Sequence, residues 1–161
     1  MRAPPPVPYV APMANRQLDT PLPEAAVERL STAFNRCFET LDAPPDLFAP
    51  DAFFDLLPPF WRFQLRGPDA FAAQLRAISG GPATARVLRV VPTATGFVVE
   101  HEESQRLAAD EVVVARRLHL CEVRDGVIAE VVTYCNGGWD APLRARHAAE
   151  APMLRDDGEA T

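Results

Sequence analysis

Lysine is absent from the chain, since all 16 of its basic residues are arginine. Without a lysine amine the protein cannot form a Schiff base with a carbonyl substrate, which excludes that route of covalent catalysis. Cysteine is scarce as well, with three residues that give neither a CxxC motif nor an even set for a disulfide framework. A reducing cytoplasm is the compartment that this cysteine content favours.

Basic residues are fewer than acidic ones, 16 against 22, so the net charge is -6. Nucleic acids and anionic membranes are bound through clustered cations, so neither is expected as a partner. No apolar run approaches the length of a membrane span or of a signal peptide, so we expect a protein that is not exported. The histidines lack HxH or HExxH spacing, so no metal is expected.

The 161 residues, 48% of them hydrophobic, suffice for one domain with a core. Seven of the 17 prolines fall in residues 1–23. This density prevents helix formation and removes backbone N–H groups that strand pairing would need. We expect a disordered arm over 1–23, a single domain over 24–150 and a flexible tail over 151–161.

The domain begins with a helical pattern. Pro23 and Glu24 suit a first turn, and apolar residues then recur at helical spacing as far as Leu41. The members of this stripe are Val27, Leu30, Phe34, Cys37, Phe38 and Leu41. The spacing predicts an amphipathic helix.

Prolines break up the next segment, so we expect only short helical pieces at 47–48 and 52–57. A second helix is predicted from Pro68, ending before Gly80. The C-terminal segment DAPLRARHAAEAPMLRDDGEAT is expected to begin with a short helical stretch and to continue as a polar tail.

Between these helices the composition changes to β-branched residues in alternating runs. The runs lie at 85–94, 96–107, 111–123 and 126–135, with turns near Thr95-Gly96, Ala108–Asp110 and Asp125-Gly126. Helices followed by a twisted antiparallel sheet indicate an α+β fold in which the helices cover one face of the sheet. Such a sheet closes around a long helix as a cone, and the mouth of a cone can bind a small ligand.

Pairing the second and third runs about a turn near Ala108-Ala109 puts His101 opposite Arg117 and Val99 opposite His119. With this register four polar side chains share the inner face, namely His101, Glu103, Arg117 and His119. A slip of one residue would turn the intervening glutamates inward instead.

Such a group could do acid-base chemistry, because imidazole exchanges a proton near neutral pH and a guanidinium can stabilise an enolate. Other readings stay open. His119 could be a packed histidine with one hydrogen-bond partner, His101 and Glu103 could belong to a solvated strand, and Arg117 could form a buried pair with Glu103.

Two segments then resemble a known family: LFAPDAFFDLLPPFWRFQLRGPDAFAAQLRAI at 47–78 and HLCEVRDGVIAEVVTYCNGGWD at 119–140. Their elements are similar in order and spacing to those of the nuclear transport factor 2-like superfamily, and within it to the SnoaL-like and ketosteroid isomerase-like proteins. The resemblance implies a cone-shaped α+β domain with N-terminal helices packed on a curved antiparallel sheet. It also implies an apolar pocket, no cofactor and a homodimer formed through the sheet.

Aligned on Asp125-Gly126, the last hairpin puts His119 where the isomerase-like proteins keep a pocket acid. The family's base corresponds to about Leu56 and its helix tyrosine to about Cys37, so a steroid-isomerase mechanism lacks both groups. Asp55 lies one position from the place of the base.

We therefore predict a cofactor-independent acid-base enzyme that acts on a hydrophobic small molecule, in the manner of a SnoaL-like cyclase or isomerase of polyketide metabolism. His119 would be the acid or base, Arg117 and His101 would stabilise charge, and Asp55 or Glu103 would be the second titrating group. The predicted substrate contacts are Trp61, Phe63, Phe54, Cys121, Val131, Thr133 and Cys135. Alternatives are a non-catalytic ligand-binding dimer, and an epoxide hydrolase or dehydratase of the same fold. The sequence NGGWD at 136–140 is interpreted as structural, with Trp139 covering a sheet edge or a dimer seam.

Overall fold

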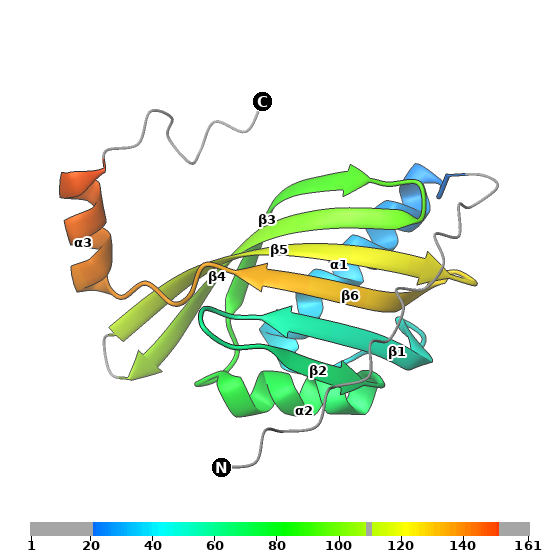
Figure 1. Cartoon of the computed structure of the whole chain (residues 1–161), viewed down its shortest axis with the longest axis horizontal. Helices are drawn as coiled ribbons and strands as arrows, with labels where there is room; N and C mark the ends of the chain where they lie inside the picture. Colours follow the sequence, from blue (N-terminus) through cyan, green and yellow to red (C-terminus); the bar gives the residue numbers. More distant parts are fainter. Residues whose placement is uncertain (1–20, 109–110, 152–161) are drawn as a thin grey trace, which may run out of the picture.

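A computed structural model describes residues 21–108 and 111–151, which form helices on one sheet (Figure 1). The expected arm and tail lie outside the described residues, apart from 21–23 and Ala151. The elements in chain order are α1 (Glu24–Thr40), β1 (Phe48–Leu57), β2 (Phe63–Arg66), α2 (Pro68–Ile78), β3 (Thr84–Pro92), β4 (Gly96–Ala108), β5 (Glu111–Arg124), β6 (Val127–Cys135) and α3 (Ala141–Glu150).

The strands form one six-stranded sheet in the order β2-β1-β6-β5-β4-β3. The four predicted strands, β3 to β6, are confirmed, and each pairs antiparallel with its neighbour in sequence. The sheet as a whole is mixed, because β1 pairs parallel with β6. The expected antiparallel sheet is therefore corrected at this one pairing, while the α+β architecture is confirmed.

The segment 48–57 is a strand, so the predicted short helical pieces at 47–48 and 52–57 are wrong. Pro50 lies where the pairing of β1 with β6 shifts register, and a missing N–H is tolerated at such an irregularity. Beyond it Ala52, Phe54 and Leu56 alternate into the core. Burial of this alternating face stabilises the strand against the helical preference of its short segments.

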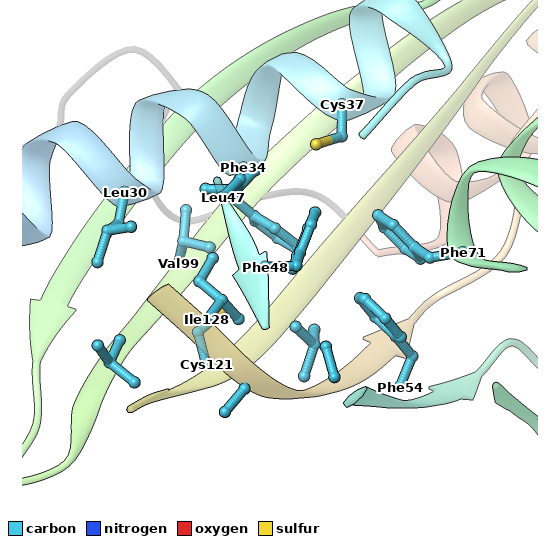
Figure 2. Close-up of a cluster of buried hydrophobic side chains, with 14 of the residues drawn as sticks. Leu30, Phe34, Cys37, Leu47, Phe48, Phe54, Phe71, Val99, Cys121 and Ile128 are labelled. Atoms are coloured by element: carbon cyan, nitrogen blue, oxygen red, sulfur yellow. The ribbon is translucent and has the colours of Figure 1, made fainter. Parts of the chain in front are cut away.

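The core fills the space between α1, α2 and the inner face of the sheet, and Figure 2 shows side chains of all three meeting there. Phe34 of α1 is fully buried, as the helical spacing predicted. Phe54 of β1 stacks on Phe71 of α2 with ring centroids 4.4 Å apart. Each aromatic ring buried in this way contributes roughly 1.5–3 kcal/mol, so the cluster fixes both helices on the sheet.

The β5–β6 hairpin is closed by Asp125 and Gly126, both at positive φ (53° and 81°), the combination that a two-residue type I′ turn requires. The register then shifts by one residue between Glu122 and Val123, and beyond this shift His119 lies opposite Thr133. In the neighbouring pair, His101 lies opposite Arg117 and Val99 opposite His119, so the predicted register is confirmed. The predicted turn residues Ala109 and Asp110 lie outside the described residues.

After β6, the NGGWD segment closes the end of the sheet. The backbone of Trp139 exchanges two hydrogen bonds with Val114 of β5, at 2.8 and 3.1 Å. Asp140 then caps α3 by accepting from the backbone N–H of Leu143 at 2.7 Å. The segment thus has a structural role, since it forms a β-bridge to β5 and caps α3. Figure 1 shows α3 beyond the end of the sheet.

Candidate functional site

Four polar side chains predicted for the inner face lie side by side on β4 and β5. His101 and His119 are fully buried, and Glu103 is 4% exposed. The side chain of Arg117 is 16% exposed and reaches the edge of the group. The solvated-strand reading of His101 and Glu103 is therefore wrong, because the register turns both inward.

A chain of hydrogen bonds joins the two histidines to residues of α1 and β6. Nδ1 of His119 lies 2.8 Å from Oγ1 of Thr133, and its Nε2 lies 3.4 Å from Nε2 of His101. Nδ1 of His101 lies 2.7 Å from Oδ1 of Asn35, whose Nδ2 donates to the carbonyl of Ala85 at 3.0 Å. Every ring nitrogen of both histidines thus has a partner.

Beside the histidines, Arg117 and Glu103 form an inward ion pair. Nε of Arg117 donates to Oε2 of Glu103 at 2.7 Å. The guanidinium also lies 5.7 Å from the centroid of the Phe38 ring, within range of a cation–π interaction. The site therefore holds one fixed cation whose charge is partly balanced.

The histidines themselves are surrounded by aromatic rings. Phe34 meets His119 edge to face at 4.9 Å between centroids, and Phe38 meets His101 at 4.6 Å. Burial, and second the charge of Arg117, lowers the pKa of His101 to about 3. Burial, with His101 and Arg117 as smaller causes, lowers the pKa of His119 well below 6.5. Both rings are therefore neutral at neutral pH.

A small hollow opens next to this group, and its volume of about 20 Å³ is room for about one water. Arg117 and Thr133 contribute to its wall, but neither histidine ring borders it. The remaining wall is largely apolar and consists of Phe38, Leu56, Leu57, Pro58, Phe63, Phe71, Leu75, Ile78 and Cys135. Any molecule in the hollow would meet Thr133 and Arg117 before either histidine.

The predicted substrate contacts divide into two groups. Phe63, Thr133 and Cys135 border the hollow. The others do not, since Phe54, Cys121 and Val131 are fully buried in the core and Trp61 is 68% exposed, touching Phe63 at 6.5 Å between centroids. The alternation of side chains along a strand predicts which face of the sheet a residue lies on. It does not predict whether a residue on the inner face lines a hollow or packs in the core.

Asp55 is not brought to the histidines. Along β1 it alternates with Leu56, which pairs with Thr133 on the inner face, so Asp55 points to the outer face. There it accepts a hydrogen bond from Nε of Arg62 at 2.7 Å and a second from the same guanidinium. These bonds hold the pKa of Asp55 below its ordinary value. A place for this carboxylate in the pocket wall is therefore wrong.

Two of the three cysteines behave as small apolar residues. Cys37 and Cys121 are buried, and burial raises the pKa of the Cys37 thiol to about 12 and that of Cys121 well above 9. Such thiols are poor nucleophiles. Among residues 21–108 and 111–151, no group of three potential ligands is arranged to hold a metal ion.

Sequence reasoning missed Asn35, which links α1 to the histidine chain. The signal was present, because an amide at this position falls within the apolar stripe of the helix, next to Phe34 and three residues before Phe38. A polar residue on a buried helical face needs a partner, and here the partners lie on β3 and β4.

A larger hollow of about 290 Å³ lies on the other face of the sheet, beneath α3. Its wall is mixed and carries several charges, being formed by Glu102, Val114, Arg116, Asn136, Trp139, Arg144 and His147. A hydrophobic substrate suits this wall less well than the apolar wall beside Thr133.

No protein-family model and no curated protein matches the chain. Solved structures do resemble it. A nuclear transport factor 2-like protein of unknown function from Burkholderia xenovorans is 18% identical over 82% of this chain and 98% of its own, with a TM-score of 0.56.

Two further similar structures are described by an enzymatic activity or by the fold of an enzyme. An LEH-like epoxide hydrolase from M. tuberculosis is 19% identical over 71% of this chain and 86% of its own, with a TM-score of 0.56. A protein from Catenulispora acidiphila with a ketosteroid isomerase-like fold is 13% identical over 65% of this chain and 83% of its own, with the same TM-score. Similarity at this level concerns the fold and leaves the reaction open. The mixed sheet over α1 and α2, together with these structures, shows that the chain has the nuclear transport factor 2-like fold.

Proposed function

We propose that this protein is a cofactor-independent acid-base enzyme acting on a hydrophobic small molecule, as a SnoaL-like cyclase or isomerase of polyketide metabolism. The observation that carries the proposal is the pair of neutral, hydrogen-bonded histidines, His101 and His119, next to a largely apolar hollow whose wall includes Arg117. A neutral imidazole can accept a proton, and a nearby fixed cation stabilises the anion that remains.

Arg117 supplies that cation. Arg117 borders the hollow, and its Nε donates to Glu103 at 2.7 Å. A guanidinium has further N–H donors, which would be the groups that bind a ligand. An enolate formed by loss of a proton beside a carbonyl would be the natural partner for such a donor. Polyketide intermediates carry acidic C–H groups between two carbonyls, so they suit a weak base paired with a strong cation.

Substrate entry would require movement, because about 20 Å³ is far below the volume of a substrate pocket. The β1–β2 connection carries the most exposed large apolar side chains of the described residues, with Phe60 fully exposed and Trp61 mostly so. Ile78 at the end of α2 is also half exposed beside the hollow. Displacement of this connection and of the end of α2 would widen the hollow toward Thr133.

A non-catalytic ligand-binding dimer is the alternative that a specific observation favours. All ring nitrogens of His101 and His119 have partners within the protein, as expected of histidines that serve packing alone. The third possibility, epoxide hydrolysis, would use two carboxylates and an arginine around one water. Its support weakens because Asp55 faces away from Glu103 and Arg117.

Replacement of His119 by Gln tests the proposal. Turnover of a hydrophobic β-diketone such as benzoylacetone, followed as deuterium exchange at the carbon between its carbonyls, should fall about 100-fold. His147→Gln, which changes a histidine on α3, is the matched control and should leave the rate unchanged. Ligand binding by the wild type without catalysed exchange would favour the binding module instead.

We also propose that the protein is a cytoplasmic homodimer formed through the sheet. Three free cysteines agree with a reducing compartment. None of the described helices is long and apolar enough to cross a membrane. Support for the dimer comes from exposed apolar side chains on the outer face of the sheet, namely Val91, Leu118, Leu120 and Tyr134.

A further inference from the structure

The amide of Asn35 fixes the direction of the histidine chain. Its Nδ2 donates to the carbonyl oxygen of Ala85 at 3.0 Å, and a carbonyl oxygen can only accept. The atom that faces His101, at 2.7 Å from Nδ1, is therefore the amide oxygen. Since this oxygen also only accepts, Nδ1 of His101 carries the proton.

The remaining links follow from the chemistry of neutral imidazole, in which one nitrogen donates and the other accepts. Nε2 of His101 presents a lone pair to Nε2 of His119, 3.4 Å away, so that nitrogen of His119 carries its proton. Nδ1 of His119 is then an acceptor, and the hydroxyl of Thr133 donates to it across 2.8 Å.

The chain therefore begins at the hollow and points inward. Thr133 borders the hollow, whereas both histidine rings are fully buried behind it. Beyond His101 the chain of hydrogen bonds ends at the amide of Asn35, which connects α1 to the carbonyl of Ala85 on β3.

We propose that the hydroxyl of Thr133 is the group that meets the substrate, that the proton it receives passes through His119 to His101, and that Asn35 is a positioning residue that keeps this path open. The inference rests on the proposed acid-base function and replaces direct contact between His119 and the substrate.

Each transfer is balanced. Oγ1 of Thr133 takes the proton of the substrate carbon acid while its own proton moves to Nδ1 of His119. His119 gives its Nε2 proton to Nε2 of His101. The substrate is left as an enolate beside Arg117 and Thr133 is again a neutral hydroxyl. His101 holds the added proton only until its return to the substrate, because burial and the charge of Arg117 disfavour a charged ring. Return of the proton to a different substrate atom reverses the three transfers and completes an isomerisation.

The first test reads the tautomers directly, by nitrogen chemical shifts of the histidine rings in the ¹⁵N-labelled full-length protein. We expect protonation at Nδ1 of His101 and at Nε2 of His119. Asn35→Ala should remove the acceptor and move the His101 proton toward Nε2. The opposite tautomers in the wild type, or no tautomer change in Asn35→Ala, would overturn the inference.

The second test uses deuterium exchange into benzoylacetone. Thr133→Val keeps the volume and removes the hydroxyl, so exchange should fall about 100-fold, while Thr133→Ser should restore it to within about tenfold. Thr93→Val is the matched control, because the Oγ1 of Thr93 is buried without a partner among the described residues and lies outside the chain.

The outcomes separate the two proposals. Loss of exchange in His119→Gln with full exchange in Thr133→Val would overturn the inference and leave the acid-base enzyme standing. No exchange above the solvent rate in the wild type would overturn the proposed function and, with it, the role of Thr133 as the substrate contact.

Discussion

At the scale of single residues, burial decides the charge of the histidines. His101 and His119 stay neutral inside the fold, whereas histidines of the unfolded chain titrate near pH 6.5. Below pH 6.5 the unfolded chain therefore binds protons on these histidines, whereas the buried rings of the folded chain stay unprotonated. The stability that these residues contribute is complete above about pH 6.5 and is lost toward acid.

We predict that the free energy of unfolding falls by about 1.4 kcal/mol per histidine for each pH unit between 6.5 and the lower pKa in the fold, which for His101 is about 3. Urea unfolding at a series of pH values from 7.5 to 5 measures the slope. His147→Gln should keep it, and the double variant His101→Gln/His119→Gln should lose most of it. An equal slope in the double variant would show that the carboxylates, and not these histidines, govern acid stability.

At the scale of elements, the β1–β2 hairpin explains why the sequence misplaced Asp55. A carboxylate beside a predicted helical piece looked like a candidate base, but a strand alternates its side chains and sends Asp55 to the outer face. Arg62 and Gln64 then hold it from the same hairpin, at 2.7 and 3.5 Å. Its role in the structure is to tie the connection to β1.

Asp55→Asn should therefore lower stability by about 1 kcal/mol, a value reduced by the solvent exposure of Arg62. It should leave benzoylacetone exchange unchanged. Asp51→Asn, which removes a more exposed partner of Arg124, is the comparison and should cost less. Unfolding midpoints measure the stability effects, and benzoylacetone exchange rates measure the effect on catalysis. A loss of exchange in Asp55→Asn with intact folding would show that this carboxylate takes part in the reaction.

At the scale of the whole molecule, one face of the sheet is covered and the other is not. Figure 1 looks onto the outer face, with α1 behind the strands. The pairing puts Leu118 beside Tyr134, and Leu120 beside Val132 and Val98, so an apolar band crosses four strands as far as Val91. Apolar bands of this kind on a sheet commonly mark an interface.

Leu120→Glu should convert the proposed dimer to a monomer at micromolar concentration, since a charge would be buried at the centre of the interface. Leu143→Glu, on exposed α3, is the matched control and should remain dimeric. Sedimentation equilibrium distinguishes the two states. A monomeric wild type at the same concentration would remove the dimer from the proposal.

The sequence by itself determined the elements whose patterns are local. The β-branched alternation of β3 to β6, the Asp125-Gly126 turn and the stripe that ends near Leu41 each follow from the conformation of neighbouring residues. From the turn and the alternation, the sequence also placed His119 on the inner face.

Tertiary structure alone decided what lies next to those residues. Whether 48–57 forms a strand depends on pairing with β6, more than 70 residues further along the chain. Asn35 reaches His101 across 66 positions, and that contact gives the histidine chain its direction. Long-range packing brings such groups together, and no local pattern encodes it. The direction of the proton path is therefore a property of the fold.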